Sequence, residues 1–110
     1  MKGKIVLVPF PFDDLSSAKM RPAVCLTNAA GPHRHVVLAF ITSRIPDEKL
    51  DSDIVINSSD KGFHQTGLRV SSTIRLHRLM TVTTSLIKRE LGKLPSQTAK
   101  GLGHEFEKFI

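Results

Sequence analysis

The chain has 110 residues, with 16 Lys or Arg against 10 Asp or Glu, and a formal net charge of +6. This length and a hydrophobic fraction of 40% fit a single domain over residues 1–110 with its own core. The one cysteine, Cys25, excludes an internal disulfide framework, and no apolar run approaches the ~20 residues that span a bilayer. No N-terminal stretch has the apolar core of a signal peptide, so we expect a cytoplasmic protein without membrane contact. The positive charge favours a polyanionic partner, either RNA, DNA or an acidic peptide, without choosing among them.

Two strand-like runs joined by a polar loop open the chain. Residues 5–8 are apolar and mostly β-branched, while Pro9 and Pro11 bar the run from continuing as a regular central strand. Residues 22–26 are apolar again after the loop. Arg21 stands where this second run begins, so a rigid strand would aim its cation.

Short apolar runs bounded by Gly, Pro, Asn, Asp or Ser recur through most of the chain, as is typical of a compact antiparallel sheet or barrel. The sequence NAAGPH at 28–33 predicts a turn, and therefore a hairpin between the runs that flank it. Residues 57–67 are polar and predict a mobile loop. The predicted strands cover residues 5–9, 23–27, 35–41, 54–57, 73–76 and 80–83.

After Val82 the apolar spacing becomes helical. Leu86, Ile87, Leu91 and Leu94 can share one helix face. Past Pro95, a second stripe comprises Ala99, Leu102, Phe106, Phe109 and Ile110. The pattern predicts a β domain closed by C-terminal helical structure, and it leaves open whether one helix or two are formed.

Residues 3–26, GKIVLVPFPFDDLSSAKMRPAVCL, resemble the N-terminal signature of the MazF/PemK family of toxin ribonucleases: a glycine, a short apolar strand, an FPF element and a loop leading into Arg-Pro-Ala. The resemblance covers nearly the whole chain. It implies a mainly β fold, the SH3-like barrel of CcdB/MazF-type toxins with a C-terminal helix or helices. It departs from that pattern at Lys4, where relatives place an acidic residue, and at Ser16, where MazF has a glutamate.

The same resemblance implies a sequence-preferring endoribonuclease, the toxin of a type II toxin–antitoxin pair, that cleaves single-stranded RNA or mRNA by 2′-OH attack. It further implies a homodimer, a cognate antitoxin whose acidic tail occupies the RNA groove, and no metal or other cofactor. The alternative is a non-catalytic binder of the same fold, either a CcdB-like gyrase poison or a degenerate RNA-binding relative.

Three places in the chain supply candidate catalytic residues. Arg21 suits stabilisation of the phosphorane, because a guanidinium stays charged and donates as a planar fork; the alternative is an ion pair with Asp13 or Asp14. Thr42 resembles the family's strand-end threonine that helps bind the scissile phosphate. Two hydroxyl residues at a strand end are also common turn formers.

Arg75 and His77 form the third place, on one face of a strand. PemK-type toxins carry an arginine and an aspartate at this spacing, so His77 stands at the acidic position. Either His77 serves as the general base, since histidine titrates near neutral pH, or it is an ordinary surface histidine.

The remaining candidates are RNA contacts. Aromatic rings commonly stack on unpaired bases, and basic or hydroxyl side chains bind phosphates. His33 and His35 could share a strand face, but no third metal ligand is indicated, so no metal site is predicted. The predicted RNA contacts are Phe10, Phe12, Lys19, Ser43, Arg44 and Arg78.

Overall fold

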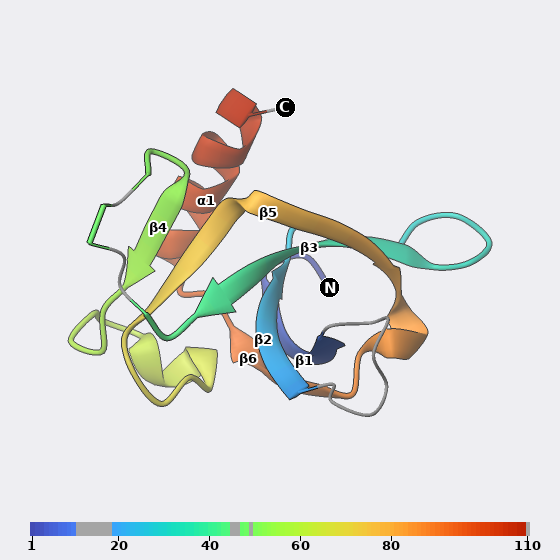
Figure 1. Ribbon diagram of the computed structural model, residues 1–110, viewed down its shortest axis with the longest axis horizontal. Coiled ribbons are helices and arrows are strands. Elements are labelled where there is room, and N and C mark those ends of the chain that lie inside the picture. The colour runs from blue at the N-terminus through green and yellow to red at the C-terminus, as the bar shows by residue number, and fades with distance from the viewer. Residues whose placement is uncertain (11–18, 45–46, 49, 110) are drawn as a thin grey trace.

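The computed structural model describes the backbone of residues 1–10, 19–44, 47–48 and 50–109, with side chains up to Leu102. Six antiparallel strands form one sheet in the order β4-β5-β3-β2-β1-β6. The sheet curls into a half-barrel, and one C-terminal helix, α1, lies beside β4 and β5 (Figure 1). The predicted fold class, mainly β with C-terminal helical structure, is confirmed. Within the described part, no helix is long and apolar enough to cross a membrane.

The sequence predicted the first three strands and the hairpin between the second and third. Residues 28–33 turn the chain as expected, with Gly31 and Arg34 at positive φ of 77° and 54°. The two runs predicted at 73–76 and 80–83 are parts of one long strand, because the chain between them stays extended although its pairing with β3 shifts register. The strands are β1 (Lys4–Phe10), β2 (Lys19–Cys25), β3 (His35–Thr42), β4 (Asp53–Ile56), β5 (Ser72–Thr83) and β6 (Arg89–Lys93).

Apolar side chains fill both faces of the curled sheet, because the strands alternate between two buried clusters. One cluster includes Ile5, Val24 and Ile74 and extends to Leu102 on α1 (Ser96–Phe109). The other lies on the opposite face, where β5 curves across β3, and includes Val8 and Leu38. Cys25 belongs to this second cluster and is fully buried, which raises the pKa of its thiol by desolvation. A fold with two cores leaves only the strand ends for a polar site.

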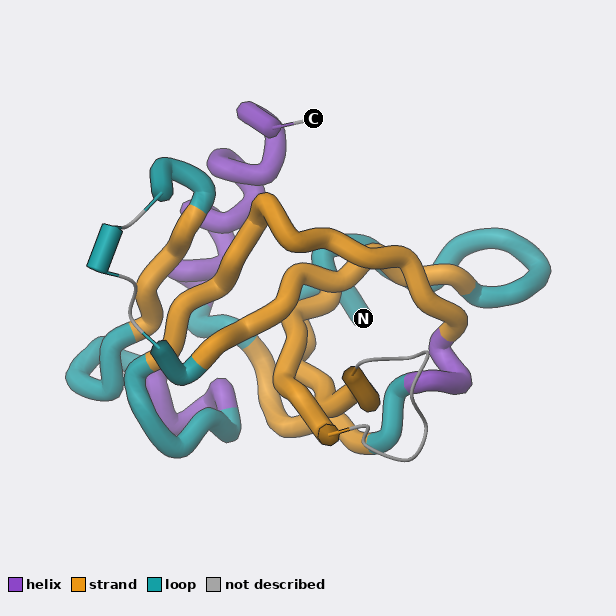
Figure 2. The backbone as a smooth tube through the Cα atoms, in the orientation of Figure 1, coloured by secondary structure: helices purple, strands orange, loops and turns teal. Residues whose placement is uncertain are grey.

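The helix predicted around residues 86–94 is wrong. The chain forms a short 3-10 turn, η2 (Thr84–Leu86), and then β6, which pairs with β1 (Figure 2). Leu91 of this strand packs against the first apolar cluster, and Leu94, just after the strand, is a buried member of it. The spacing of four apolar residues in a short window fits a helix or a strand, and the pairing with β1 makes residues 89–93 a strand. The C-terminal region therefore holds one α-helix.

Residues 57–67 are more ordered than a mobile loop. They include the 3-10 helix η1 (Phe63–Thr66), whose Thr66 is fully buried. The turn packs so closely on β6 that a Cβ at Gly67 would collide with the Leu91 carbonyl oxygen, and one at Gly92 with that of Gln65. These glycines bring the turn against the edge of β6.

Candidate functional site

The sheet splits at one end, between β2 and β3. Their ladder stops at Ala23 and Phe40, although β2 starts before this pair and β3 continues beyond it. Hydrogen-bonded pairs alternate along an antiparallel ladder, and the next such pair would be Pro22 and Ile41. Proline has no N–H to donate, so one of the two hydrogen bonds of that pair is lost, and the ladder ends before it. The start of β2 stays paired with β1 and the end of β3 with β5, which leaves a notch between them.

A cavity of about 790 Å³ lies at this notch and is lined by both Pro22 and Ile41. Its walls come from the end of β1, the start of β2, the end of β3, the segment before β5, β5 itself and β6. Six of the chain's seven arginines line it, whereas no lysine or carboxylate among the described residues does. The six are Arg21, Arg44, Arg69, Arg75, Arg78 and Arg89. A pocket with this lining suits a ligand with several negative charges, because guanidinium groups bind anionic oxygens through forked, planar contacts.

Most of the predicted site residues meet at this cavity. Two exceptions are Lys19 and His77, which are described and exposed but do not line it. Phe12 and the aspartates proposed as ion-pair partners of Arg21 lie outside the described residues. The predicted residues that line the cavity are Phe10, Arg21, Thr42, Ser43, Arg44, Arg75 and Arg78.

Thr42 ends β3 on the cavity wall. Its Oγ1 accepts a hydrogen bond from the Arg44 N–H (3.2 Å), so the hydroxyl forms the turn that leads out of the strand. The hydroxyl proton still serves as a donor, because the oxygen is the acceptor in that bond. Turn formation and anion binding are therefore compatible at this residue.

Phe10 and Phe40 supply an aromatic surface beside the arginines. Their ring centroids are 4.9 Å apart and their planes are tilted by 59°. Both side chains line the cavity and are half-buried. Such a pair offers a flat apolar face to a planar ligand group as well as contributing to the core.

Arg75 and His77 converge on a carboxylate that the sequence did not indicate. Arg75 Nε donates to Asp53 Oδ1 (3.2 Å), and His77 Nδ1 lies 3.7 Å from the same oxygen. Ser52 Oγ is 3.2 Å from His77 Nδ1. The prediction that Arg75 and His77 share a face agrees with this common partner, but the cavity reaches Arg75 alone.

Sequence reasoning missed three residues of this region. Arg69 and Arg89 stand alone in their segments and carry no motif, so only the folded chain brings them to the cavity. Asp53 was placed outside the predicted strand 54–57. The pairing of β4 with β5, which sets Asp53 opposite Arg75, is the signal that identifies it.

The whole sequence also matches a known protein family. The model of PemK-like, MazF-like toxins of type II toxin–antitoxin systems matches residues 1–110. The chain belongs to this family. No curated protein matches it.

Solved structures share the fold of this PemK-like chain at low sequence identity. An endoribonuclease in complex with its cognate antitoxin, from a mycobacterial species, has a TM-score of 0.71 at 13% identity, over 98% of this chain and 91% of its own. The toxin MazF-mt6 of Mycobacterium tuberculosis has a TM-score of 0.66 at 19% identity, over 96% and 93%. An endoribonuclease from a mycobacterial species has a TM-score of 0.69 at 14% identity, over 98% and 88%.

The signature segment of this PemK-like chain forms one wall of the cavity, through Phe10, Arg21 and Pro22. Of the two departures from the family pattern, Ser16 lies outside the described residues. Lys4 pairs with Glu90 across β1 and β6 (2.8 Å), and the hydrogen bond that the lysine ammonium donates to this carboxylate raises the pKa of the lysine. This departure is accommodated at the exposed sheet edge, away from the cavity.

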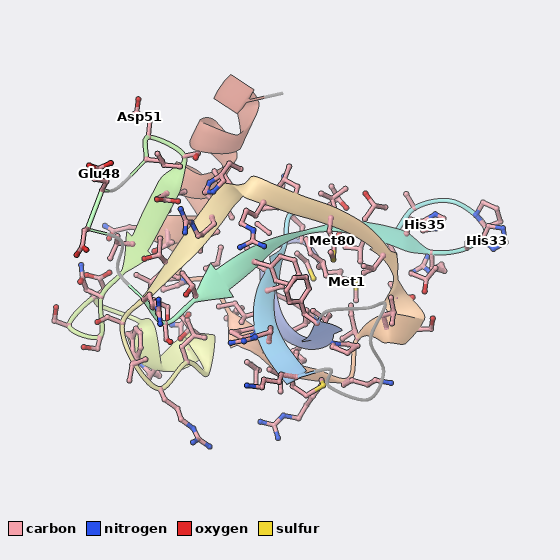
Figure 3. The ribbon with its side chains drawn as sticks, viewed as in Figure 1. Met1, His33, His35, Glu48, Asp51 and Met80 are labelled. Carbon is pink, nitrogen blue, oxygen red and sulfur yellow. The ribbon has the colours of Figure 1, made fainter. Side chains whose placement is uncertain are left out.

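His33 and His35 lie at the tip of the β2–β3 hairpin, while Glu48 and Asp51 lie near β4 at the opposite end of the molecule (Figure 3). The two imidazole rings are 6.0 Å apart. No group of three or more metal-ligating side chains occurs in the described part of this PemK-like chain.

Proposed function

We propose that this toxin-family protein is a sequence-preferring endoribonuclease that cleaves single-stranded RNA, including mRNA, without a metal ion. The observation that carries the proposal is the cavity lined by six arginines and by no described carboxylate. RNA presents one phosphate per nucleotide, and forked guanidinium groups match the phosphate oxygens. Cellular mRNA as the substrate places the protein in the cytoplasm.

The proposed reaction uses the ribose 2′-OH as the nucleophile. The 2′-oxygen bonds to phosphorus, the bond from phosphorus to the 5′-oxygen breaks, and the products carry a 2′,3′-cyclic phosphate and a 5′-OH. Because the substrate supplies its own nucleophile, the protein needs to bind the phosphate, stabilise the phosphorane and move protons.

Arg21 and Arg75 suit the stabilisation of charge on the phosphorane, since both reach the cavity. Thr42 is proposed to donate its hydroxyl proton to a phosphate oxygen. His77 is assigned as the general base for the 2′-OH because the described cavity wall holds only arginines, hydroxyls and apolar side chains. It is linked to the cavity through Asp53, whose Oδ1 contacts Arg75 and lies 3.7 Å from the imidazole.

The other cavity residues would bind the strand on either side of the cleaved bond. Phe10 and Phe40 offer a stacking surface for a base, and Ser43, Arg44 and Arg78 would hold phosphates. Lys19, at the start of β2, and Phe12 are proposed as further RNA contacts. A solved endoribonuclease of this fold is in complex with its cognate antitoxin, which supports an antitoxin as the protein partner here. We further propose that the toxin acts as a homodimer.

One observation favours the non-catalytic alternative. His77 lies outside the cavity, and the described wall residues include no ordinary general base. A cavity of this kind could bind RNA or an acidic protein surface without cleaving it. The binder would then be either a degenerate RNA-binding relative or a CcdB-like gyrase poison.

The test is incubation of the purified protein with single-stranded RNA in EDTA. We expect cleavage that leaves a cyclic phosphate and a 5′-OH. A matched substrate with a single 2′-deoxy nucleotide on the 5′ side of the cleaved bond should stay intact, because it lacks the nucleophile. Intact RNA, with cell growth arrested through gyrase, would show that the protein is a binder.

A further inference from the structure

Asp53 is a buried carboxylate that the proposed mechanism leaves without a role. It begins β4, and its side chain is 0% exposed. Oδ2 accepts a hydrogen bond from the Leu50 N–H (3.0 Å), and Oδ1 accepts one from Arg75 Nε (3.2 Å). A carboxylate is costly to bury unless charged or hydrogen-bonding partners compensate for the lost water. Its two hydrogen bonds supply that compensation, and one of the two donors, Arg75, lines the cavity.

The contact with Arg75 uses only part of the guanidinium. Nε is engaged by Asp53, so the two terminal NH₂ groups are those that can bind a phosphate as a fork. Arg75 lines the cavity, and its side chain is 26% exposed, so most of it is enclosed by the protein. Asp53 and Arg75 are also direct partners in the β4–β5 ladder, which fixes the two backbones relative to each other.

The position of His77 is also set from the β4 side of the sheet. The register between β3 and β5 jumps from Ala39 and Leu79 to Phe40 and Arg75, so His77 lies in a bulge that β3 does not pair. On the β4 side, the Leu76 N–H donates to the Ser52 carbonyl (3.2 Å).

The imidazole faces two groups there. Nδ1 faces Ser52 Oγ at 3.2 Å and Asp53 Oδ1 at 3.7 Å. With its proton on Nδ1, the imidazole would face two oxygens that can accept, the serine hydroxyl and the carboxylate, and Nε2 would be the acceptor nitrogen.

We propose that Asp53 is the positioning residue of this site, which turns the Arg75 fork into the cavity and holds His77 with Nε2 ready to accept a proton. The inference rests on the proposed ribonuclease function and adds to it a residue that no motif indicated. Asp53 acts through Arg75 and His77 and does not touch the RNA.

The test compares Asp53→Asn with Asp60→Asn. Asp60 makes the same kind of bond, since its Oδ2 accepts from the Asn57 N–H (2.9 Å), but it is exposed and does not line the cavity. For each variant, kcat and KM on a single-stranded RNA, the pH profile of kcat, and the affinity for an uncleavable 2′-deoxy RNA are measured. Circular dichroism and the thermal midpoint report the folded fraction.

We expect Asp53→Asn to lower kcat by about ten- to a hundredfold, since small misplacements of catalytic groups have effects of this size. Affinity for the uncleavable RNA should change less than about threefold, because the other arginines still bind it. The acid limb of the kcat profile, which reports the proton acceptor, should change as it does in His77→Ala. Asp60→Asn should match the wild type in all these measurements.

Arg75→Lys gives a second test if Asp53→Asn does not fold. Lysine keeps the positive charge but lacks Nε and the fork, so kcat should fall similarly. Where Asp53→Asn does fold, adding it to Arg75→Lys should lower kcat by a smaller factor than it does in the wild type, because both changes disrupt the same Asp53–Arg75 contact.

Wild-type kcat in folded Asp53→Asn, or in Arg75→Lys, overturns the positioning role. A loss of kcat that the unfolded fraction of the variant explains entirely overturns that role as well. A wild-type protein that leaves RNA intact overturns the proposed function itself, which is a separate outcome.

Discussion

Pro22 of β2 and Ile41 of β3 are the first residues beyond the end of the ladder between their strands, and both line the cavity. The proline of the Arg-Pro-Ala sequence removes the N–H that the next ladder bond would need. The same short sequence thus supplies a cation, Arg21, and the proline at the notch beside it. This gives a physical role to a residue that at first only marked a family.

Restoring the missing donor should narrow the notch. We expect Pro22→Ala to stay folded and to lose up to about a hundredfold in RNA cleavage, because the strands can pair further and shift the cavity walls. Pro9→Ala is the control, since Pro9 also lacks an N–H but pairs with Met20 of β2 and faces away from β3. Cleavage kinetics and amide exchange at Ile41 check the result. If the Ile41 amide becomes protected from exchange and cleavage is unchanged, the gap between β2 and β3 is not required for activity.

Arg69 and Arg89 should contribute to RNA binding although no motif indicated them. Each phosphate contact to a single strand contributes about −0.7 to the slope of log affinity against log salt concentration. Replacing either arginine by alanine should therefore make that slope shallower by about 0.7, measured by fluorescence anisotropy with uncleavable RNA. Arg34→Asn is the matched control, because Arg34 is the one arginine outside the cavity and asparagine tolerates its positive φ of 54°. Equal slopes in all three variants would exclude both arginines from the RNA path.

His77→Ala should lower kcat by about a hundredfold, the scale of general acid–base catalysis. A base must be neutral to accept a proton, so activity should fall toward acid in the wild type and this acid limb should flatten in the variant. His33→Ala, at the distant hairpin tip, is the control and should keep the wild-type profile (Figure 3). If His77→Ala keeps both kcat and the acid limb, His77 is a surface histidine held by Ser52 and Asp53.

Close backbone packing between η1 and β6 should make Gly92 intolerant of a side chain. A Cβ there would collide with the Gln65 carbonyl oxygen and lie 2.6 Å from the Thr66 carbonyl carbon. We expect Gly92→Ala to lower the free energy of unfolding by about 1–3 kcal/mol or more, measured by urea denaturation. A Cβ at Gly101, exposed in α1, meets nothing within 4 Å, so Gly101→Ala should raise it by about 1 kcal/mol. Equal effects at both positions would contradict the packing described for β6.

Local sequence was sufficient for the strands whose apolar runs end at clear turns, as in β1, β2 and β3. It was also sufficient for α1, where Leu102 of the predicted apolar stripe joins the first apolar cluster. It failed at β6, because the spacing around Leu91 fits a helix equally well until β1 pairs with it. Only tertiary pairing distinguishes the two.

The residues of the candidate site also divide into those that local sequence indicated and those that only the folded chain brings together. Arg21, Thr42 and Arg75 could be predicted because they occur within recognisable segments of the family. Arg69 and Arg89 could not, since the cavity joins segments that are far apart in the chain. Asp53 could not either, because its meaning depends on lying opposite Arg75 after β4 and β5 pair.

The most direct test of the central claim, that the arginine-lined cavity cleaves RNA, is to compare the wild type with Arg21→Ala on one single-stranded RNA in EDTA. Arg21 is exposed on the cavity wall, so its truncation should leave the fold and thermal midpoint unchanged. Arg34→Asn serves as the control for loss of one positive charge. We predict that the wild type and Arg34→Asn cleave the RNA and that Arg21→Ala does not. Full cleavage by folded Arg21→Ala would contradict the account.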